Sequence, residues 1–377
     1  MEQGEIRIGV VGCGGFGLYA LQQFVQVPGV RLKAMAGTSR EASIAAARRF
    51  GVPDVEDVDT LLSRDDVDLV YIATPPFLHH PQAMQALRAG KHVICEKPLA
   101  TTVAQADEML AEARRNDRLL TANLMQRYNP VSDAVGRLIS EKVLGEPIHA
   151  FFENYASDEN LGPNHWFWDR SKSGGIFIEH GVHFFDLFEG WLGKGEVVAA
   201  QAGIRPGSAP PIEEQVQCTM RYADDVLVNY YHGFHQPGRM DRQEMRLVFE
   251  RGDVSLFGWI PTLVKVHAVA DEAQTRALCD LFPGARLDST TTYAPKDRAC
   301  EARHKKLDVY QTLELTWGEG AVKSHRYGEL LRAVMADQVA WIRDRSHPRR
   351  ITETNGRDSL AIACEADRLA QIGRSDA

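Results

Sequence analysis

The feature that most constrains how this chain folds is a glycine-rich turn that directly follows its first apolar run. Residues 6–12, IRIGVVG, are typical of a buried strand, and an amphipathic pattern begins directly after GVVGCGGFG. Within this turn Gly12, Gly14 and Gly17 have the spacing GxGxxG. The first glycine permits a tight turn, the second lets a ligand approach the backbone, and the third lets helix and strand pack closely. The pattern predicts a strand, a turn and a helix at the start of a parallel sheet.

The first third of the chain keeps this alternation of short apolar runs and helical patterns. Further strands are predicted at 31–37, 68–74, 91–95 and 119–125, and the clearest amphipathic helix at 102–117. Strands that alternate with helices form parallel βαβ units whose sheet is covered on both faces. We therefore expect a Rossmann-type, doubly wound α/β domain over residues 1–126.

The rhythm changes after residue 126. HAFFENY (149–155) and later runs such as EQVQCTMRY and VLVNYYHGF have strand character and are joined by polar turns. Consecutive strands predict a second α/β domain, residues 127–377, built on a large open, mostly antiparallel sheet. Helical patterns at 325–346 and 357–373 close the chain and can pack back on the first domain. The region 271–312 has mixed character and receives no assignment.

Composition excludes several classes of function. Hydrophobic residues make up 44% and charged residues 25% of the 377 residues, which is typical of a globular protein. A net charge of −8 without a Lys/Arg-rich run argues against nucleic acid or an anionic membrane as a partner. The six scattered cysteines favour free thiols, and no signal sequence or bilayer-spanning apolar run is visible. We therefore expect a cytoplasmic protein that binds a small molecule.

The glycine turn predicts a dinucleotide cofactor, since the N-terminus of the following helix offers free N–H groups to a pyrophosphate. The predicted contacts are Gly12, Gly14, Gly15, Phe16 and Gly17. At the end of the second strand, where NAD enzymes usually carry Asp or Glu, the chain reads AMAGTSRE. Thr38, Ser39 and Arg40 suit a 2′-phosphate, so NADP(H) is favoured. NAD(H) remains an alternative, because Thr38 and Ser39 are also good helix caps.

Two further segments carry polar residues where chemistry is expected. CEKPLA follows the strand at 91–95, at the edge where open α/β sheets bind ligands, and Pro98 keeps Lys97 out of a helix. SGGIFIEHGVHFFD (173–186) has the pattern of a buried helix and yet carries Glu179 and His183 four residues apart. Buried carboxylates and imidazoles are rare unless something pairs with them or uses them. A solvated lysine and a structural Glu–His–Asp network remain the alternatives to a functional site.

Together these segments resemble the Gfo/Idh/MocA family, the glucose–fructose oxidoreductase and inositol dehydrogenase family. The resemblance rests on GVVGCGGFG, YIATPPFLHHPQAMQALRAGKHVICEKPLA (71–100), LLTANLMQRYNP (119–130) and SGGIFIEHGVHFFDLFEGWLG (173–193). It implies a Rossmann domain, and a second domain whose open sheet is often the contact of a homo-oligomer, dimer or tetramer. It also implies a catalytic lysine, matched by Lys97, and a carboxylate and a histidine, matched by Glu179 and His183. The family usually has Asp where this chain has Glu179.

The resemblance extends to binding residues, taken position by position. It implies cofactor contacts at Thr74, Pro75, His79, Glu96 and Lys97. It implies contacts to a polyhydroxylated substrate at Arg127, Tyr128, Tyr155, Trp166, Trp168, Asp169 and His180. No metal is expected, because the nicotinamide supplies the redox chemistry.

The reaction implied by the resemblance moves hydride between nicotinamide and a carbon bearing a secondary alcohol in a sugar or cyclitol. We interpret His183 as the base for the hydroxyl proton and Lys97 as the group that stabilises charge on the oxygen, although the two roles are exchangeable. Glu179 then orients the imidazole or binds a neighbouring hydroxyl. Two alternatives stay open. One is a redox-assisted glycoside lyase or hydrolase with an internally recycled cofactor, and the other is a non-catalytic dinucleotide-binding regulator.

Overall fold

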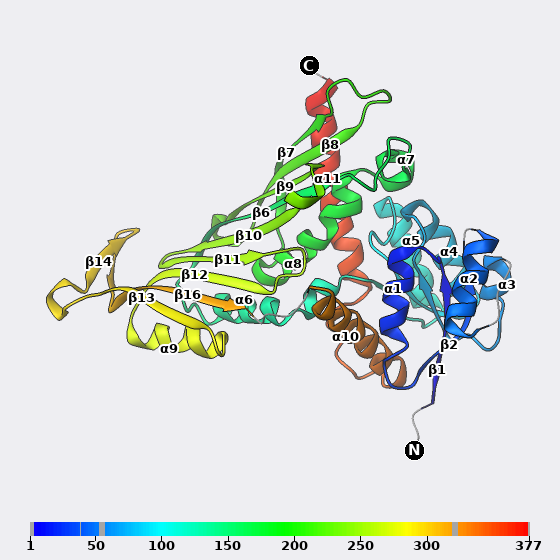
Figure 1. Cartoon of the computed structure of the whole chain (residues 1–377), viewed down its shortest axis with the longest axis horizontal. Coiled ribbons are helices and arrows are strands. Elements are labelled where there is room, and N and C mark those ends of the chain that lie inside the picture. The colour runs from blue at the N-terminus through cyan, green and yellow to red at the C-terminus, as the bar shows by residue number, and fades with distance from the viewer. Residues whose placement is uncertain (1–3, 38, 53–56, 319–322, 376–377) are drawn as a thin grey trace. The chain divides into compact units, whose positions relative to one another are not determined.

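The computed structural model describes residues 4–37, 39–52, 57–318 and 323–375, and it divides into two compact units. The first unit comprises Met1–Tyr128, Pro163–Asp186 and Tyr327–Asp367, and the second comprises Asn129–Gly162, Leu187–Arg326 and Arg368–Ala377. Each unit therefore collects segments that are distant in the sequence, as the colours of Figure 1 show.

The first unit is built on a five-stranded parallel sheet with the strand order β2-β1-β3-β4-β5. Its strands are β1 (Ile6–Val11), β2 (Val30–Ala36), β3 (Leu69–Ile72), β4 (His92–Cys95) and β5 (Leu120–Ala122). Every residue of β3 and β4 is buried, because both faces of the sheet are covered by helices. This arrangement confirms the predicted doubly wound parallel sheet.

Helices cover the two faces of this sheet. On one face α1 (Gly15–Phe24) and α10 (Lys323–Arg343) join a core that includes Phe24, Tyr71 and Met335, and on the other α4 (His79–Arg88) contacts β3 and β4. The remaining helices and helical turns are α2 (Arg40–Phe50), α3 (Val58–Leu62), η1 (Pro76–Leu78), α5 (Val103–Arg115), η2 (Met125–Tyr128), η3 (Trp166–Trp168), α7 (Arg170–Ser173), η4 (Phe177–Gly181), α8 (Val182–Leu192) and α11 (Glu353–Ser375).

The strand order brings three loops to one edge of the sheet. The direction of strand addition reverses between β1 and β3, and ligands of open α/β sheets bind at the carboxyl ends next to such a reversal. The glycine turn follows β1, the turn at Pro75 follows β3, and Lys97 follows β4. The topology therefore gathers the sequence motifs at the carboxyl edge.

The second unit is built on a nine-stranded sheet with the order β13-β16-β12-β11-β10-β6-β9-β8-β7. Only β6 and β9 pair in parallel among these described strands, which confirms the predicted open, mostly antiparallel sheet. Its elements are α6 (Pro130–Ser140), β6 (Pro147–Ser157), β7 (Glu196–Ile204), β8 (Glu213–Arg221), η5 (Ala223–Asp225), β9 (Leu227–Gln236), η6 (Gly238–Met240), β10 (Arg242–Phe249), β11 (Gly252–Phe257), β12 (Leu263–Ala270), α9 (Glu272–Leu281), β13 (Arg286–Thr292), η7 (Pro295–Asp297) and β16 (Gln311–Gly318), with a separate hairpin of β14 (Ala299–Ala302) and β15 (Lys305–Asp308).

Candidate active site

The glycine turn after β1 leaves an open space above its middle residues. Gly12 has a φ of +108°, and a Cβ there would lie 2.5 Å from the carbonyl of Ala73. A Cβ at Gly17 would lie 2.8 Å from the Cβ of Ala73, so this glycine lets α1 pack against the sheet. Cβ atoms at Gly14 and Gly15 would meet nothing within 4 Å. The outer glycines are therefore required by packing, while the middle ones leave room for a ligand.

The N-terminus of α1 opens into this space. The helix begins at Gly15, and its N-cap Gly14 supplies no side-chain hydrogen bond to the first turn. The first N–H groups of a helix lack partners within the helix and attract anions together with the helix dipole. These residues, with the exposed Phe16 beside them, fit the pyrophosphate of a dinucleotide.

The loop after β2 presents the two described residues that were assigned to cofactor selection. Ser39 and Arg40 are exposed, whereas Thr38 lies outside the described residues. The Ser43 hydroxyl accepts a hydrogen bond from Gly37 N at 2.7 Å and donates to Ser39 O at 3.0 Å. These two hydrogen bonds hold the backbone of the loop. Arg40 is exposed at the surface.

The loops after β3 and β4 are joined by a buried histidine. The ring nitrogens of His79 lie 2.7 Å from the carbonyl oxygens of Thr74 and Pro98. The Thr74 hydroxyl donates to Gln82 at 2.7 Å, and Pro75 begins the short helical turn η1. His79 thus connects the predicted cofactor-binding turn to the loop that carries Lys97.

Glu96, at the end of β4, belongs to a buried polar cluster. Its Oε1 accepts hydrogen bonds from the Tyr71 hydroxyl at 2.6 Å and from Asn123 Nδ2 at 2.8 Å. Burial raises the pKa of Glu96, while the Asn123 and Tyr71 hydrogen bonds oppose this shift. The cluster anchors the end of β4 directly before Lys97.

The predicted catalytic lysine and carboxylate are in direct contact. Lys97 Nζ donates to Glu179 Oε1 at 2.5 Å and to the Glu179 carbonyl oxygen at 2.9 Å. The two side chains are 18% and 12% exposed, so a ligand can still reach them. The Glu179 carboxylate is expected from the sequence to orient His183 or to bind a substrate hydroxyl. In the structure it forms an ion pair with the Lys97 ammonium.

An irregular helix start positions Glu179. Gly174 and Gly175 have φ values of +85° and +103°, and a Cβ at Gly174 would lie 2.7 Å from Ile178. Gly174 ends α7 in the left-handed conformation that glycine adopts most easily. The following residues form the π-helical turn η4 before α8 begins. Such turns are frequent at functional sites, and this one contains Glu179.

His183 lies in the first turn of α8 and is 3% exposed. Burial, and to a lesser extent the positive charge of Lys97, hold the pKa of the His183 imidazole well below its ordinary value. The ring is therefore neutral near pH 7, with a nitrogen lone pair that carries no proton. His180 is also buried, with its ring centroid 6.0 Å from that of Phe184.

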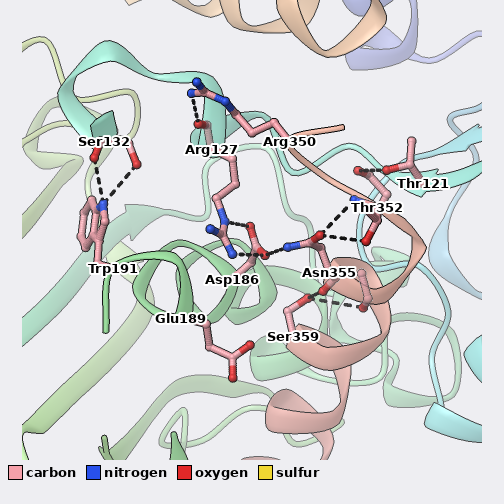
Figure 2. A network of polar contacts seen from close by, with 12 residues as sticks. Thr121, Arg127, Ser132, Asp186, Glu189, Trp191, Arg350, Thr352, Asn355 and Ser359 are labelled. Carbon is pink, nitrogen blue, oxygen red and sulfur yellow. Dashed lines mark hydrogen bonds and ion pairs between the residues drawn. The ribbon is translucent and has the colours of Figure 1, made fainter. Parts of the chain in front are cut away.

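Two residues assigned to substrate binding have structural partners. Arg127 donates to both carboxylate oxygens of Asp186, as Figure 2 shows. The Tyr128 hydroxyl donates to Asp337 at 2.5 Å. Sequence reasoning missed both Asp337 and Asn355, which also bonds to Asp186. The only local signal for Asn355 was its place in TETN, a pattern typical of a helix start.

The loop before the double glycine contains the aromatic residues predicted to bind substrate. Trp166 and Trp168 are half-buried in η3, and the Trp166 ring centroid lies 5.2 Å from that of His165. Asp169 caps α7, since its Oδ1 accepts from Ser171 N at 3.0 Å, and it pairs with Lys172. Asp169 therefore has a local structural role in this loop.

Tyr155 belongs to the second unit, on β6. Its ring lies over the Arg242 guanidinium at 4.7 Å and near Tyr231, with ring centroids 5.2 Å apart. It lines a hollow of about 550 Å³ on β6, β7, β8 and β9, together with Glu153, Gln217 and Tyr231. None of the three predicted catalytic residues lines this hollow.

The described residues contain neither a metal-ligand cluster nor a helix suited to span a membrane. Within residues 4–37, 39–52, 57–318 and 323–375, no three His, Cys, Asp or Glu side chains are placed to hold a metal ion. In the same residues no helix combines the length and the apolar character needed to cross a membrane. The six cysteines are all free thiols.

Comparison with known families gave two matches. The model described as "Oxidoreductase family, NAD-binding Rossmann fold" matches residues 6–124. The model described as "GFO/IDH/MocA C-terminal domain" matches residues 133–255. The two models describe the two domains of one family and together match more than half of the chain.

Individual proteins are also similar to this chain. It is 39% identical over 151 residues to dTDP-3,4-didehydro-2,6-dideoxy-alpha-D-glucose 3-reductase of Actinomadura kijaniata, covering 40% of this chain and 45% of that protein. It is 35% identical over 161 residues to inositol 2-dehydrogenase of Rubrobacter xylanophilus, covering 42% and 46%. The chain thus spans about half the length of the curated relatives it matches.

Among solved structures, the WlbA dehydrogenase from Bordetella pertussis in complex with NADH and UDP-GlcNAcA has a TM-score of 0.77 at 18% identity. That match covers 99% of this chain and 97% of the other. The likeness shows that the two proteins share their fold.

Proposed function

Because this chain belongs to the Gfo/Idh/MocA family of oxidoreductases, we propose that it transfers hydride between a nicotinamide dinucleotide and a sugar, sugar derivative or cyclitol. The reacting carbon carries a secondary alcohol or a ketone. The observation that carries the proposal is the contact of Lys97 with Glu179 in the unit that also buries a neutral His183. The substrate class is supported by relatives that are named as a sugar-nucleotide reductase and an inositol dehydrogenase.

His183, Lys97 and Glu179 each have a separate role in this reaction. In the oxidation direction the imidazole of His183 accepts the hydroxyl proton. The lowered pKa of His183 keeps the ring unprotonated before the reaction, although it also makes the ring a weaker base. Lys97 donates a hydrogen bond to the same oxygen and stabilises the negative charge that develops there. Glu179 holds the ammonium in place through the 2.5 Å contact. The bound nicotinamide supplies the hydride acceptor or donor.

The proposal includes a preference for NADP(H) over NAD(H). Arg40 is exposed at the start of α2, and guanidinium groups bind phosphate through paired hydrogen bonds. We expect Arg40→Ala to weaken NADPH binding at least tenfold, since a charge-assisted hydrogen bond contributes about 1.5–3 kcal/mol. NADH binding should change less than twofold. Fluorescence titration of both nucleotides measures this, and equal losses for the two would contradict the assignment.

The first experiment releases and identifies the nucleotide in the purified protein, then follows turnover of added NADP⁺ and NAD⁺ with a panel of sugars and cyclitols. Net turnover that is lost in Lys97→Met and His183→Gln supports the dehydrogenase. A retained nucleotide that never exchanges, together with cleavage of a glycoside, supports the redox-assisted lyase instead. Nucleotide binding with no turnover, and a biological role that survives Lys97→Met, supports the regulator.

The proposal also covers the assembly and location of the protein. The resemblance to this family implies a homo-oligomer, dimer or tetramer, held by the open face of the nine-stranded sheet. Light scattering of the purified protein measures the assembly. The scattered free cysteines suit a cytoplasmic enzyme, and fractionation of the source cells tests that location.

A further inference from the structure

A buried ion-pair cluster lies one turn beyond His183. Asp186 is 2% exposed and accepts from Arg127 Nε at 2.8 Å and from Arg127 Nη2 at 3.1 Å. Asn355 Nδ2 donates to the same carboxylate at 2.9 Å. Figure 2 shows the side chains of Arg127 and Asn355 converging on this carboxylate. Three charge-assisted hydrogen bonds therefore fix a single aspartate of α8.

The partners of Asp186 are themselves fixed from the closing segment of the chain. Asn355 Oδ1 accepts from the backbone N–H of Thr352 at 2.9 Å, which orients its amide toward Asp186. Arg350 Nη1 donates to the carbonyl of Arg127 at 2.8 Å. The cluster thus joins η2, the first turns of α8 and the start of α11 within the first unit.

Burial of this cluster needs a reason other than stability. A buried ion pair gives up hydration and often contributes little net stability, but in some proteins it enforces one geometry on the segments that it joins. Asp186 and His183 are three residues apart in one helix, so the rotation and height of this turn set the position of the imidazole. Displacement of a reacting group by about 1 Å can lower a rate about 10²-fold.

We propose that Asp186, Arg127 and Asn355 are positioning residues that hold His183 in register, so that the segment 350–355 is a working part of the active site. The inference rests on the proposed function of His183. Asn355 lies outside the two ranges that the family models match, residues 6–124 and 133–255. None of the three residues needs to touch the substrate for this role.

The test compares Asp186→Asn and Asn355→Ala with a matched control, Asp68→Asn. Asp68 also forms a two-point pair with an arginine, Arg7, at 2.8 and 2.6 Å. This pair lies at the amino-terminal ends of β1 and β3. We expect kcat to fall about 10–100-fold in Asp186→Asn and 3–10-fold in Asn355→Ala, with KM for the nucleotide changed less than twofold. Asp68→Asn should lower the melting temperature but leave kcat unchanged well below that temperature.

A second readout does not depend on turnover. In protein labelled with ¹⁵N-histidine, the His183 ring signals are identified by their loss in His183→Gln, and they should shift in Asn355→Ala but stay in place in Asp68→Asn. If Asp186→Asn does not fold, Asn355→Ala carries the test, since it leaves the Arg127–Asp186 pair intact. Unchanged kcat and unchanged His183 signals in folded Asn355→Ala overturn the proposal. Shifted signals in a protein without dehydrogenase activity would instead reject the proposed function and keep the positioning.

Discussion

At the scale of single residues, the contact between Lys97 and Glu179 decides how the site can work. The ammonium gives two of its three N–H groups to Glu179, one to the carboxylate and one to the carbonyl. A substrate oxygen can take the third, so Glu179 determines the direction in which Lys97 presents its remaining donor. The side chain of Glu179 has the length to make this contact.

We expect Glu179→Gln to lower kcat/KM at least tenfold. The amide keeps the shape of the side chain but loses its charge, and a charge-assisted hydrogen bond contributes about 1.5–3 kcal/mol. Steady-state kinetics at saturating nucleotide measures the loss. Glu108→Gln is the control, because Glu108 forms an exposed pair with His80. Wild-type kcat/KM in Glu179→Gln would show that Lys97 needs no orienting partner.

At the scale of elements, the parts of the fold that the sequence predicted are those with a regular burial pattern. β3 and β4 are fully buried, and their unbroken apolar runs indicated a sheet covered on both faces. β13 is mostly exposed, and the β14–β15 hairpin is exposed as well, so residues 286–308 have no regular burial pattern to interpret. A turn with an irregular register, such as η4, has no sequence signal of this kind.

The candidate site shows the same limit. Lys97 lies in the EKP segment, and Glu179 and His183 are four residues apart, so the resemblance to the family could indicate these three residues from the sequence. The bond from Tyr128 to Asp337 joins residues 209 positions apart. No spacing rule connects such residues, because the contact depends on how α10 returns to the first unit. The resemblance to the family implies substrate contacts at Arg127 and Tyr128, and the structure adds protein partners for both side chains.

Two single substitutions in the glycine turn distinguish its role in packing from its role in ligand binding. We expect Gly14→Ala to leave the stability of the ligand-free protein within about 1 kcal/mol and to weaken nucleotide binding at least tenfold. Gly14 has a φ of −78° and open space at its Cβ position, so only the ligand meets the new methyl group. Thermal unfolding and fluorescence titration with NADPH measure the two effects.

Gly12→Ala is the contrasting variant. Its φ of +108° and the 2.5 Å approach to the Ala73 carbonyl should destabilise the ligand-free protein by at least about 1–2 kcal/mol. Equal destabilisation of the two variants, or unchanged NADPH binding in Gly14→Ala, would contradict the role given to this turn.

At the scale of the whole chain, both units bury neutral histidines. Burial, helped by Arg118 and Arg345, lowers the pKa of His92 in the first unit to about 4. Burial lowers the pKa of His232, on β9 of the second unit, to about 3. In the unfolded chain both rings recover a pKa near 6.5. At these two rings the folded chain therefore binds fewer protons than the unfolded chain. The free energy of unfolding thus depends on pH through a histidine in each unit.

We expect the free energy of unfolding to fall as the pH is lowered from about 6.5 to about 4.5. Above pH 6.5 both states are neutral at these rings, and below it only the unfolded state binds the proton, at up to about 1.4 kcal/mol per pH unit for each histidine. Urea unfolding at a series of pH values measures the slope. His232→Leu should reduce this slope by about one proton. The raised pKa of Glu96 has the opposite effect on the slope, but it is common to wild type and variant and cancels in the difference. A His232→Leu protein with the wild-type slope would show that this ring is protonated in the folded state.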